Sequence, residues 1–325
     1  MKVILNKSTD PYFNLALEEY LLRNSDEEYF MLWRNRPSII VGRNQNTLAE
    51  INREYVSEHK IPVVRRQSGG GAVFHDLGNI NYTFISNSRS NGFSNYELFC
   101  RPIIEVLHSL GVNAVLSGRN DLLIDGKKFS GNAQCAYKNR LMHHGTLMFC
   151  ADVSDMTAAL NVNPLKIQSK GIKSVRSRVT NISEHLPEPM GIEEFCERIV
   201  RHISADGSGV PYELSEADIA AVRKLVREKY SLDEWNYGFS KDYSVSKQSI
   251  FPCGFFDVKI NIAENKISDI RIFGDYFGQR SVEEIEKLLT GADYSVHGLR
   301  AALSGVMTDE YFSGLSTDEL ISALI

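Results

Sequence analysis

The sequence predicts an α+β fold with a mixed or largely antiparallel sheet, followed by a smaller second domain. Strand-like and helix-like segments are mixed without a regular βαβ period, which argues against a doubly wound parallel sheet. At roughly 150 residues per domain, 325 residues suggest two domains. A polar, turn-rich stretch spans 236–248. We therefore expect a larger first domain over 1–240, a linker over 241–248 and a smaller second domain over 249–325.

The elements of the first domain follow from hydrophobic periodicity. A helix is expected at 13–23, where Leu15, Tyr20 and Leu22 fall at roughly helical spacing. Two strands follow at 29–34 and 38–42, separated by a turn that ends in proline. The further strands are expected at 61–65, 72–75, 81–86, 112–116, 121–124 and 145–150, and the further helices at 95–110, 153–160, 192–204 and 215–229.

The second domain is expected to pair a small sheet with helices. Apolar residues alternate along 254–262, which predicts a strand with one buried face. Glu264 and Asn265 form a turn into a second strand at 266–273. Helices are then expected at 281–290, 295–303 and 317–324.

Composition excludes several classes of protein. Hydrophobic content of 43% and charged content of 24% are ordinary for a globular chain. A net charge of −5 argues against general nucleic-acid binding, and no apolar run approaches the about 18 residues of a membrane span. Five scattered cysteines without a Cys-x-x-Cys pair indicate neither a disulfide framework nor a zinc site. We expect a cytoplasmic monomer without nucleic-acid or membrane partners.

The most informative segment is glycine-rich and runs from 65 to 82. Gly69, Gly70 and Gly71 lie between two expected strands, and Arg65 and Arg66 precede them. Glycine permits positive φ and close approach of a ligand, successive N–H groups can cradle an anion, and guanidinium suits phosphate or carboxylate. The segment matches neither a P-loop nor a dinucleotide fingerprint. An anion site is one interpretation, and a tight turn beside a solvated arginine pair is the other.

A lysine-bearing hairpin is the second candidate. Asp125 and Gly126 signal a tight turn, after which Lys127 and Lys128 should point to opposite faces of the returning strand. One lysine can then face a cleft while the other faces water, although both could be solvated. Asp121, at the far end of the hairpin, could reach a metal ion.

Other segments carry weaker signals. From 156 to 183 the chain has no acidic residue but several lysines and arginines, which suits a solvated face or a loop over an anionic substrate. The pair His143 and His144 lacks further ligands at metal spacing. Cys150 is by default a buried, inert thiol, and the Gly-x-Ser-x-Gly elbow of serine hydrolases is missing.

Taken together, these segments strongly resemble the lipoate–protein ligase A family. The longest matching motif is Arg65-Arg-Gln-Ser-Gly-Gly-Gly-Ala-Val-Phe-His-Asp-Leu-Gly-Asn. The matching segments lie in the family's order at 14–19, 32–35, 41–46, 65–79, 118–122, 128–133, 143–147 and 170–181. The resemblance covers residues 3 to about 185, and the region after 250 resembles the family's small C-terminal domain more weakly.

The resemblance implies a biotin/lipoate ligase-type catalytic domain with a mixed sheet, and an ATP-dependent ligase. Lipoate and ATP, with Mg2+, would first give lipoyl-AMP and pyrophosphate. The lipoyl group would then pass to a specific lysine of a partner protein. The implied partners are the lipoyl domains of 2-oxoacid dehydrogenase E2 subunits or the glycine-cleavage H protein.

The resemblance also assigns roles to residues. Lys128 would be the catalytic lysine that touches both the lipoate carboxyl and the α-phosphate. The remaining ATP and adenylate contacts would be Arg66, Gly71, Ala72, Val73 and Phe74. The lipoate pocket would be lined by Trp33, Val41, Ser68, Gly70, His75, Asn79 and His144. Asp121 would contact Mg2+, and the basic loop 166–178 would fold over the adenylate.

Three other functions are compatible with parts of this pattern. A transferase of the same fold would move octanoyl or lipoyl groups through a thioester on Cys150 or Cys135 without ATP. A biotin ligase is disfavoured because its Gly-Arg-Gly-Arg signature is missing. A sensor that binds lipoyl-adenylate or an acidic lipoyl domain without turnover is disfavoured by the retention of Arg66, the glycine loop and Lys128. The choice between lipoate and octanoate is left open by the sequence.

Overall fold

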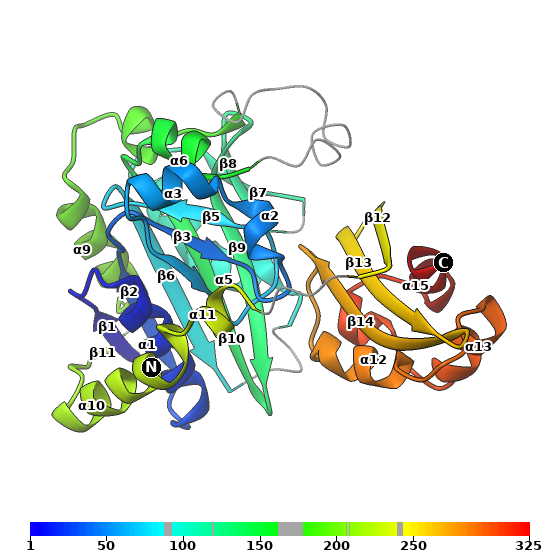
Figure 1. Cartoon of the computed structure of the whole chain (residues 1–325). Coiled ribbons are helices and arrows are strands. Elements are labelled where there is room, and N and C mark those ends of the chain that lie inside the picture. Colours follow the sequence, from blue (N-terminus) through cyan, green and yellow to red (C-terminus); the bar gives the residue numbers. More distant parts are fainter. Residues whose placement is uncertain (88–92, 119, 162–177, 206, 208, 239–242) are drawn as a thin grey trace.

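The computed structural model describes residues 1–87, 93–118, 120–161, 178–205, 207, 209–238 and 243–325, arranged as a larger N-terminal part and a smaller C-terminal part (Figure 1). The strands of the larger part are β1 (Lys2–Leu5), β2 (Tyr29–Trp33), β3 (Ser38–Val41), β4 (Val63–Arg65), β5 (Val73–His75), β6 (Asn79–Ser86), β7 (Ala114–Ser117), β8 (Asp121–Ile124), β9 (Lys127–Tyr137), β10 (Arg140–Met148) and β11 (Val210–Pro211). Its helices are α1 (Pro11–Arg23), α2 (Thr47–Glu50), α3 (Arg53–Glu58), α5 (Tyr96–Ser109), α6 (Val153–Ala159), η1 (Ile182–His185), α9 (Ile192–Ile203), α10 (Glu216–Leu225), the π-helix η2 (Val226–Tyr230) and α11 (Asp233–Asn236).

The larger part is built on a mixed sheet, which confirms the predicted fold class. Its eight strands lie in the order β11-β1-β2-β6-β10-β9-β8-β7. Strand β1 runs parallel to β11 and β2, and the other pairs are antiparallel. A separate three-stranded sheet, β4-β3-β5, carries the glycine-rich segment between β4 and β5.

The large sheet is covered on both faces, and the functional residues lie on one of them. Helices α5 and α9 pack on the first face through a core that includes Phe99, Ile199 and Phe30. Helix α1 and the segment α10–η2 pack on the second face, against Met31 and Met142. Successive residues of a strand point to opposite faces, so Trp33 and His144 share the second face with Met31 and Met142.

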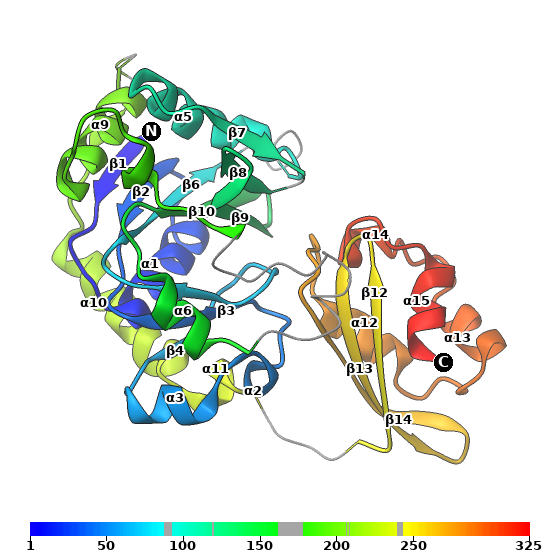
Figure 2. The same ribbon diagram turned by 90° about the horizontal axis from the view of Figure 1, so that it is seen from above.

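The C-terminal part has its own core. Its antiparallel sheet comprises β12 (Val245–Phe251), β13 (Gly254–Ala263) and β14 (Lys266–Gly274). Its helices are α12 (Val282–Leu289), α13 (Val296–Ala302), α14 (Asp309–Phe312) and α15 (Thr317–Leu324), which lie on one side of the sheet (Figure 2). Glu264 and Asn265 have φ of 51° and 62°, the left-handed conformation that a two-residue hairpin needs. No helix in the described part of the chain is long and apolar enough to cross a membrane.

Most predicted elements lie within a few residues of their expected bounds, and the differences have local causes. Strand β12 occupies the last four residues of the segment expected as a linker, 241–248, because its polar side chains alternate with partly buried ones along a sheet edge. Strand β10 begins at Arg140, ahead of the expected 145–150. The helix expected at 215–229 is α10 followed by the π-helix η2. Strands β1 and β11 and helices α2, α3, α11 and α14 are two to six residues long and carry little periodicity.

Candidate functional site

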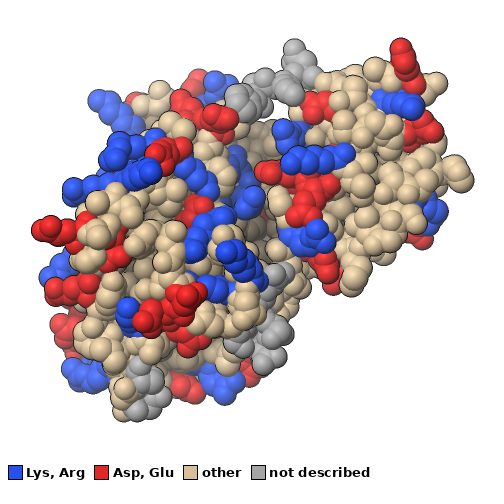
Figure 3. Space-filling model, turned by 90° about the horizontal axis from the view of Figure 1, so that it is seen from below, with Lys and Arg blue, Asp and Glu red and all other residues tan. Residues whose placement is uncertain are grey.

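A cavity of about 680 Å³ lies between the second face of the large sheet, the β4-β3-β5 sheet and the C-terminal part. The larger part contributes Leu15, Glu18, Trp33, Ile40, Arg66, Gly70, Gly71, Ala72, Val73, His75, Asn81, Asn120, Asp121, Lys128, Gly131, Asn132, Ala133, His144, Gly145 and Thr146. The C-terminal part contributes residues 250–255, Asp275 and Phe277. Lysine and arginine side chains gather on the larger part beside the hollow between the two parts (Figure 3). Residues far apart in sequence thus converge on one chamber.

Lys128 reaches the cavity because strand β9 contains a bulge. Leu122 pairs with Ser130 but Leu123 pairs with Lys128, so Phe129 is an extra residue that turns Lys128 to the face of Gly131. Its Nζ lies 2.6 Å from Asp121 Oδ1, and the two side chains are 40% and 37% exposed. A Cβ on Gly131 would lie 2.9 Å from Lys128 Nζ, so glycine at this position leaves room for the lysine. Lys127 is exposed and does not line the cavity.

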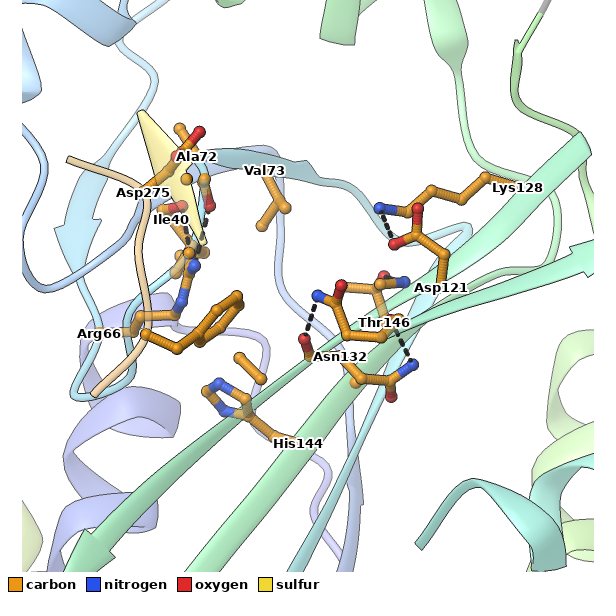
Figure 4. Close-up of a pocket in the computed structure, with 18 of the residues that line it drawn as sticks. Ile40, Arg66, Ala72, Val73, Asp121, Lys128, Asn132, His144, Thr146 and Asp275 are labelled. Carbon is orange, nitrogen blue, oxygen red and sulfur yellow. Dashed lines mark hydrogen bonds and ion pairs between the residues drawn. The ribbon is translucent and has the colours of Figure 1, made fainter. Parts of the chain in front are cut away.

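Arg66 lies across the cavity from Lys128 and holds the glycine loop (Figure 4). Its Nη2 donates to the carbonyls of Gly69 and Gly71 at 2.7 and 2.8 Å, and its Nη1 donates to Ile40 O at 3.1 Å. Burial lowers the pKa of Arg66 to about 10. This value is still well above neutral pH, so the guanidinium stays charged. A buried cation therefore faces the chamber.

Arg65 has a different environment from its neighbour. Its side chain donates six hydrogen bonds, five of them to backbone carbonyls and one to Thr47 Oγ1. Its acceptors include the carbonyls of Trp235 and Asn236, and its backbone N–H donates to Asn236 Oδ1 at 3.0 Å. Arg65 does not line the cavity. It joins β4 to α11 and serves the fold.

Glycines are required where the loop meets the C-terminal part. A Cβ on Gly69 would lie 2.4 Å from the carbonyl oxygen of Tyr276. Gly70 has φ of +92°, and its Cβ would lie 2.9 Å from the Phe277 ring. Gly274 N donates to Asn44 O at 2.8 Å. The C-terminal part therefore rests directly on the glycine loop.

A hydrogen-bonded network extends across one wall of the chamber. Trp33 Nε1 donates to Thr83 Oγ1 at 2.9 Å, and Thr83 Oγ1 donates to Glu18 Oε1 at 2.6 Å. His144 joins the same Glu18 oxygen through Nδ1 at 2.9 Å and Ser68 Oγ through Nε2 at 2.7 Å. Sequence reasoning missed Glu18. The signal was available, because an acidic residue between Leu15 and Leu22 on the apolar face of the predicted helix has to be paired.

His75 lines the chamber as a neutral side chain. Burial and the nearby Arg66 lower the pKa of His75 to about 3. Asn14 Nδ2 donates to Asn35 Oδ1 at 2.9 Å, which leaves Asn35 Nδ2 to donate to His75 Nδ1 at 3.1 Å. This arrangement places the ring hydrogen on Nε2, which has no hydrogen-bond partner among the described residues.

The structure brings most of the predicted site residues to the chamber but not all of them. Phe74 and Val41 pack in the core beside Ile39, because strand alternation turns them away from the cavity. Asn79 is buried and does not line the cavity, and its Nδ2 donates to Asn81 Oδ1 at 3.1 Å. Ser68 is buried and does not line the cavity, but it contacts His144, which does. The basic loop expected over 166–178 falls, except for Arg178, outside the described residues.

The described residues give no support to nucleophilic catalysis. Neither Cys150 nor Cys135 lines the cavity, and partial desolvation raises the pKa of both thiols. The expectation that Cys150 is buried is wrong, because it lies just beyond the end of strand β10 and is exposed. Ser68, His144 and Glu18 have the spacing of a hydrolase triad, but Ser68 Oγ is buried and accepts a hydrogen bond from Arg66 Nε at 3.0 Å. No group of three or more His, Cys, Asp or Glu side chains suited to a metal ion occurs in the part of the chain that the structure describes.

Comparison with known proteins gives two family matches. The lipoyl protein ligase A/B catalytic domain matches residues 10–204, and the bacterial lipoate protein ligase C-terminus matches residues 240–324. Lipoate-protein ligase LplJ of Bacillus subtilis (strain 168) is 46% identical over 320 residues, which cover 97% of each chain. Lipoate–protein ligase 1 of Staphylococcus aureus (strain Mu50) is 46% identical over 324 residues, which cover 99% of each chain.

Solved structures share the fold. P. falciparum LipL1 in complex with lipoate matches with a TM-score of 0.83 and 24% identity, covering 99% of this chain and 98% of that one. A bipartite lipoate protein ligase, studied with its E2 lipoyl domain from Thermoplasma acidophilum, has a TM-score of 0.66 and 27% identity, covering 75% and 98%. A lipoate-protein ligase A bound with ATP has a TM-score of 0.64 and 25% identity, covering 73% and 98%. The resemblance seen in the motifs is confirmed, and the chain belongs to the lipoate–protein ligase A family.

Proposed function

We propose that this protein is an ATP-dependent lipoate–protein ligase that forms lipoyl-AMP and then transfers the lipoyl group to a lysine of an acceptor protein. The observation that carries the proposal is the convergence of Lys128, Arg66 and the glycine loop on one chamber. Relatives named lipoate–protein ligase at 46% identity, and a family structure bound with ATP, support it.

The first half-reaction requires positioning and charge stabilisation. A carboxylate oxygen of lipoate attacks the α-phosphorus of ATP, an O–P bond forms, and pyrophosphate leaves. Both reactants are anionic, so a cation between them lowers the barrier. We assign this role to Lys128, whose ammonium faces the chamber, and we assign nucleotide contacts to Arg66 and the backbone of Gly71, Ala72 and Val73.

The wall around Trp33 suits the apolar part of lipoate. Leu15, Ile40 and Trp33 offer apolar surface, and His75 adds a neutral ring. The dithiolane and its alkyl chain would lie here, with the carboxylate directed toward Lys128. The C-terminal segment 250–255, with Asp275 and Phe277, completes the chamber and helps to exclude water from a hydrolysable adenylate.

Asp121 fits a magnesium ion that is held mainly by substrate. Mg2+ in nucleotide sites commonly takes one or two carboxylates together with phosphate oxygens. Asp121 lines the chamber beside Lys128 and supplies one such carboxylate. When bound, Mg2+ would neutralise phosphate charge, while Lys128 and Arg66 hold the substrates in place.

In the second half-reaction the ε-amine of an acceptor lysine attacks the acyl carbon, and AMP leaves. The acceptor we propose is a lipoyl domain of a 2-oxoacid dehydrogenase E2 subunit or a glycine-cleavage H protein. The structural relative from Thermoplasma acidophilum, paired with an E2 lipoyl domain, supports the first of these. None of the five cysteines, all of which the structure describes, forms a disulfide, which suits the reducing cytoplasm where we place this reaction.

A single incubation tests the proposal. The purified protein is mixed with ATP, magnesium and lipoate without an acceptor, and lipoyl-adenylate is sought by mass spectrometry together with released pyrophosphate. Both products are expected. If neither forms, the ligase assignment is wrong, and a thioester on Cys150 or Cys135 after incubation with an octanoylated protein would indicate a transferase instead.

Two neighbouring lysines give a matched pair of variants. Lys128→Ala is expected to lose adenylate formation with the fold intact, because the cation between the two anions is removed. Lys127→Ala is expected to keep adenylation within about threefold, since exposed charges contribute little. Near wild-type adenylation in Lys128→Ala would contradict the assignment of that lysine.

A further inference from the structure

Arg66 is a buried cation that directly contacts no carboxylate among the described residues. Its Nη1 and Nη2 groups hold backbone carbonyls, and its Nε donates to Ser68 Oγ at 3.0 Å. The acid that acts on it electrostatically is Glu18, which raises the pKa of Arg66 against the effect of burial. Glu18 is itself buried, on helix α1 rather than beside the glycine loop. A buried charge requires compensation, so the connection between these two groups matters.

The connection runs through two side chains in a fixed direction. A carboxylate only accepts hydrogen bonds, so His144 Nδ1 must carry the hydrogen that Glu18 accepts. His144 Nε2 is then free to accept from the Ser68 hydroxyl at 2.7 Å. Ser68 Oγ in turn accepts from Arg66 Nε. Glu18, His144, Ser68 and Arg66 thus form one row of hydrogen bonds. The two middle groups, His144 and Ser68, each donate on one side and accept on the other, while Glu18 only accepts and Arg66 only donates.

The row also fixes the geometry of Arg66. The guanidinium is planar, so holding Nε fixes the plane in which Nη1 and Nη2 lie. Those two nitrogens carry the bonds to Ile40, Gly69 and Gly71 that shape the loop. A change at Glu18 would therefore reach the nucleotide side of the chamber through contacts of 2.7 to 3.0 Å.

We infer that Glu18 is a positioning residue that acts through His144 and Ser68 to orient Arg66 and the glycine loop for the nucleotide. This inference rests on the proposed function, in which Arg66 and the loop contact ATP. Glu18 also lines the chamber, so a direct effect on lipoate is the competing explanation. The two explanations differ in which substrate loses affinity.

The test measures the dissociation constants of ATP and lipoate separately, by titration calorimetry on the full chain. The variants are Glu18→Gln, Ser68→Ala and the double variant. Each single variant is expected to weaken ATP binding by about tenfold, the order expected when a hydrogen bond of a charged group is lost. Lipoate affinity should change by less than about threefold. The double variant should bind ATP about as well as either single variant, because both changes break one row.

Glu19→Gln is the matched control. Glu19 is the next residue of the same helix and is buried, but it bonds Lys229 and Tyr230 outside the chamber. The control should keep wild-type affinity for ATP, and thermal unfolding confirms that all variants are folded. Additive losses in the double variant, or loss of lipoate affinity with ATP binding unchanged, would overturn the inference.

Arg66→Ala separates this inference from the proposed function. If Arg66→Ala binds ATP like the wild type, the nucleotide role of Arg66 is wrong and the inference falls with it. If Arg66→Ala loses ATP affinity while Glu18→Gln keeps it, the row alone is refuted and the proposed function stands.

Discussion

Replacing Gly131 with alanine tests how closely the position of Lys128 is set. The new Cβ would lie 2.9 Å from Lys128 Nζ and 3.1 Å from its Cε. Ordinary contacts of carbon with nitrogen or carbon are about 3.5–4.0 Å, so the end of the lysine must move by roughly 0.5–1 Å. A displacement near 1 Å at a reacting group costs up to about a hundredfold in rate. We expect adenylation to slow by about 10- to 100-fold.

The fold should tolerate this substitution. Lys128 and Asp121 are both well exposed, so weakening their ion pair changes the free energy of unfolding by at most about 1 kcal/mol. The assay is pyrophosphate release with saturating ATP and lipoate, alongside urea unfolding. In a Lys128→Ala background, any residual rate should be the same with and without Gly131→Ala, because the effect acts through that side chain. Wild-type rates in Gly131→Ala, or an equal further loss in that background, would refute the reasoning.

Three further predictions concern charge, packing and thiols. The pKa of His75 is about 3 in the fold, against about 6.5 when unfolded, so the unfolded chain binds more protons between these values and stability falls as pH drops through this window. In His75→Gln, the free energy of unfolding should fall less steeply with falling pH, by up to about 1.4 kcal/mol per pH unit, as measured by urea unfolding between pH 7 and pH 5. Arg65→Lys should lower the free energy of unfolding by about 2–4 kcal/mol, because an ammonium cannot serve the same acceptors, and a change below 0.5 kcal/mol would argue against the role given to Arg65. Cys150→Ser should keep full activity in the acceptor assay, and a complete loss would revive the thioester mechanism.

The sequence predicted which residues are functional better than it predicted the strands and turns that position them. Strands with apolar alternation, such as β13, could be located because period 2 is visible in the residues. Strand β9 was predicted only at its start. One of its faces lines a polar chamber, so apolar and polar residues do not alternate along it. The bulge at Phe129 depends on pairing with β8, which no local pattern records.

The same limit applies to the site. The motif around Arg66 indicated an anion site, but Arg65 and Arg66 are adjacent and alike in sequence. Their different roles come from strand alternation and from α11, which lies about 170 residues later. Contributions of the C-terminal part, such as Phe277, could not be predicted because they depend on how two separately built cores meet.

The hydrogen bonds between Arg65 and α11 keep the C-terminal part close to the chamber that it covers. Trp235 and Asn236 are fastened to the strand that leads into the glycine loop, and β12 begins only nine residues after Asn236. The C-terminal part is thus tethered from a fixed point close to the surface that it covers. A short tether gives a local concentration in the millimolar range, so even a weak contact with Gly69 and Gly70 is occupied much of the time. The same segment supplied as a separate molecule would have to reach about millimolar concentration to cover the chamber as often.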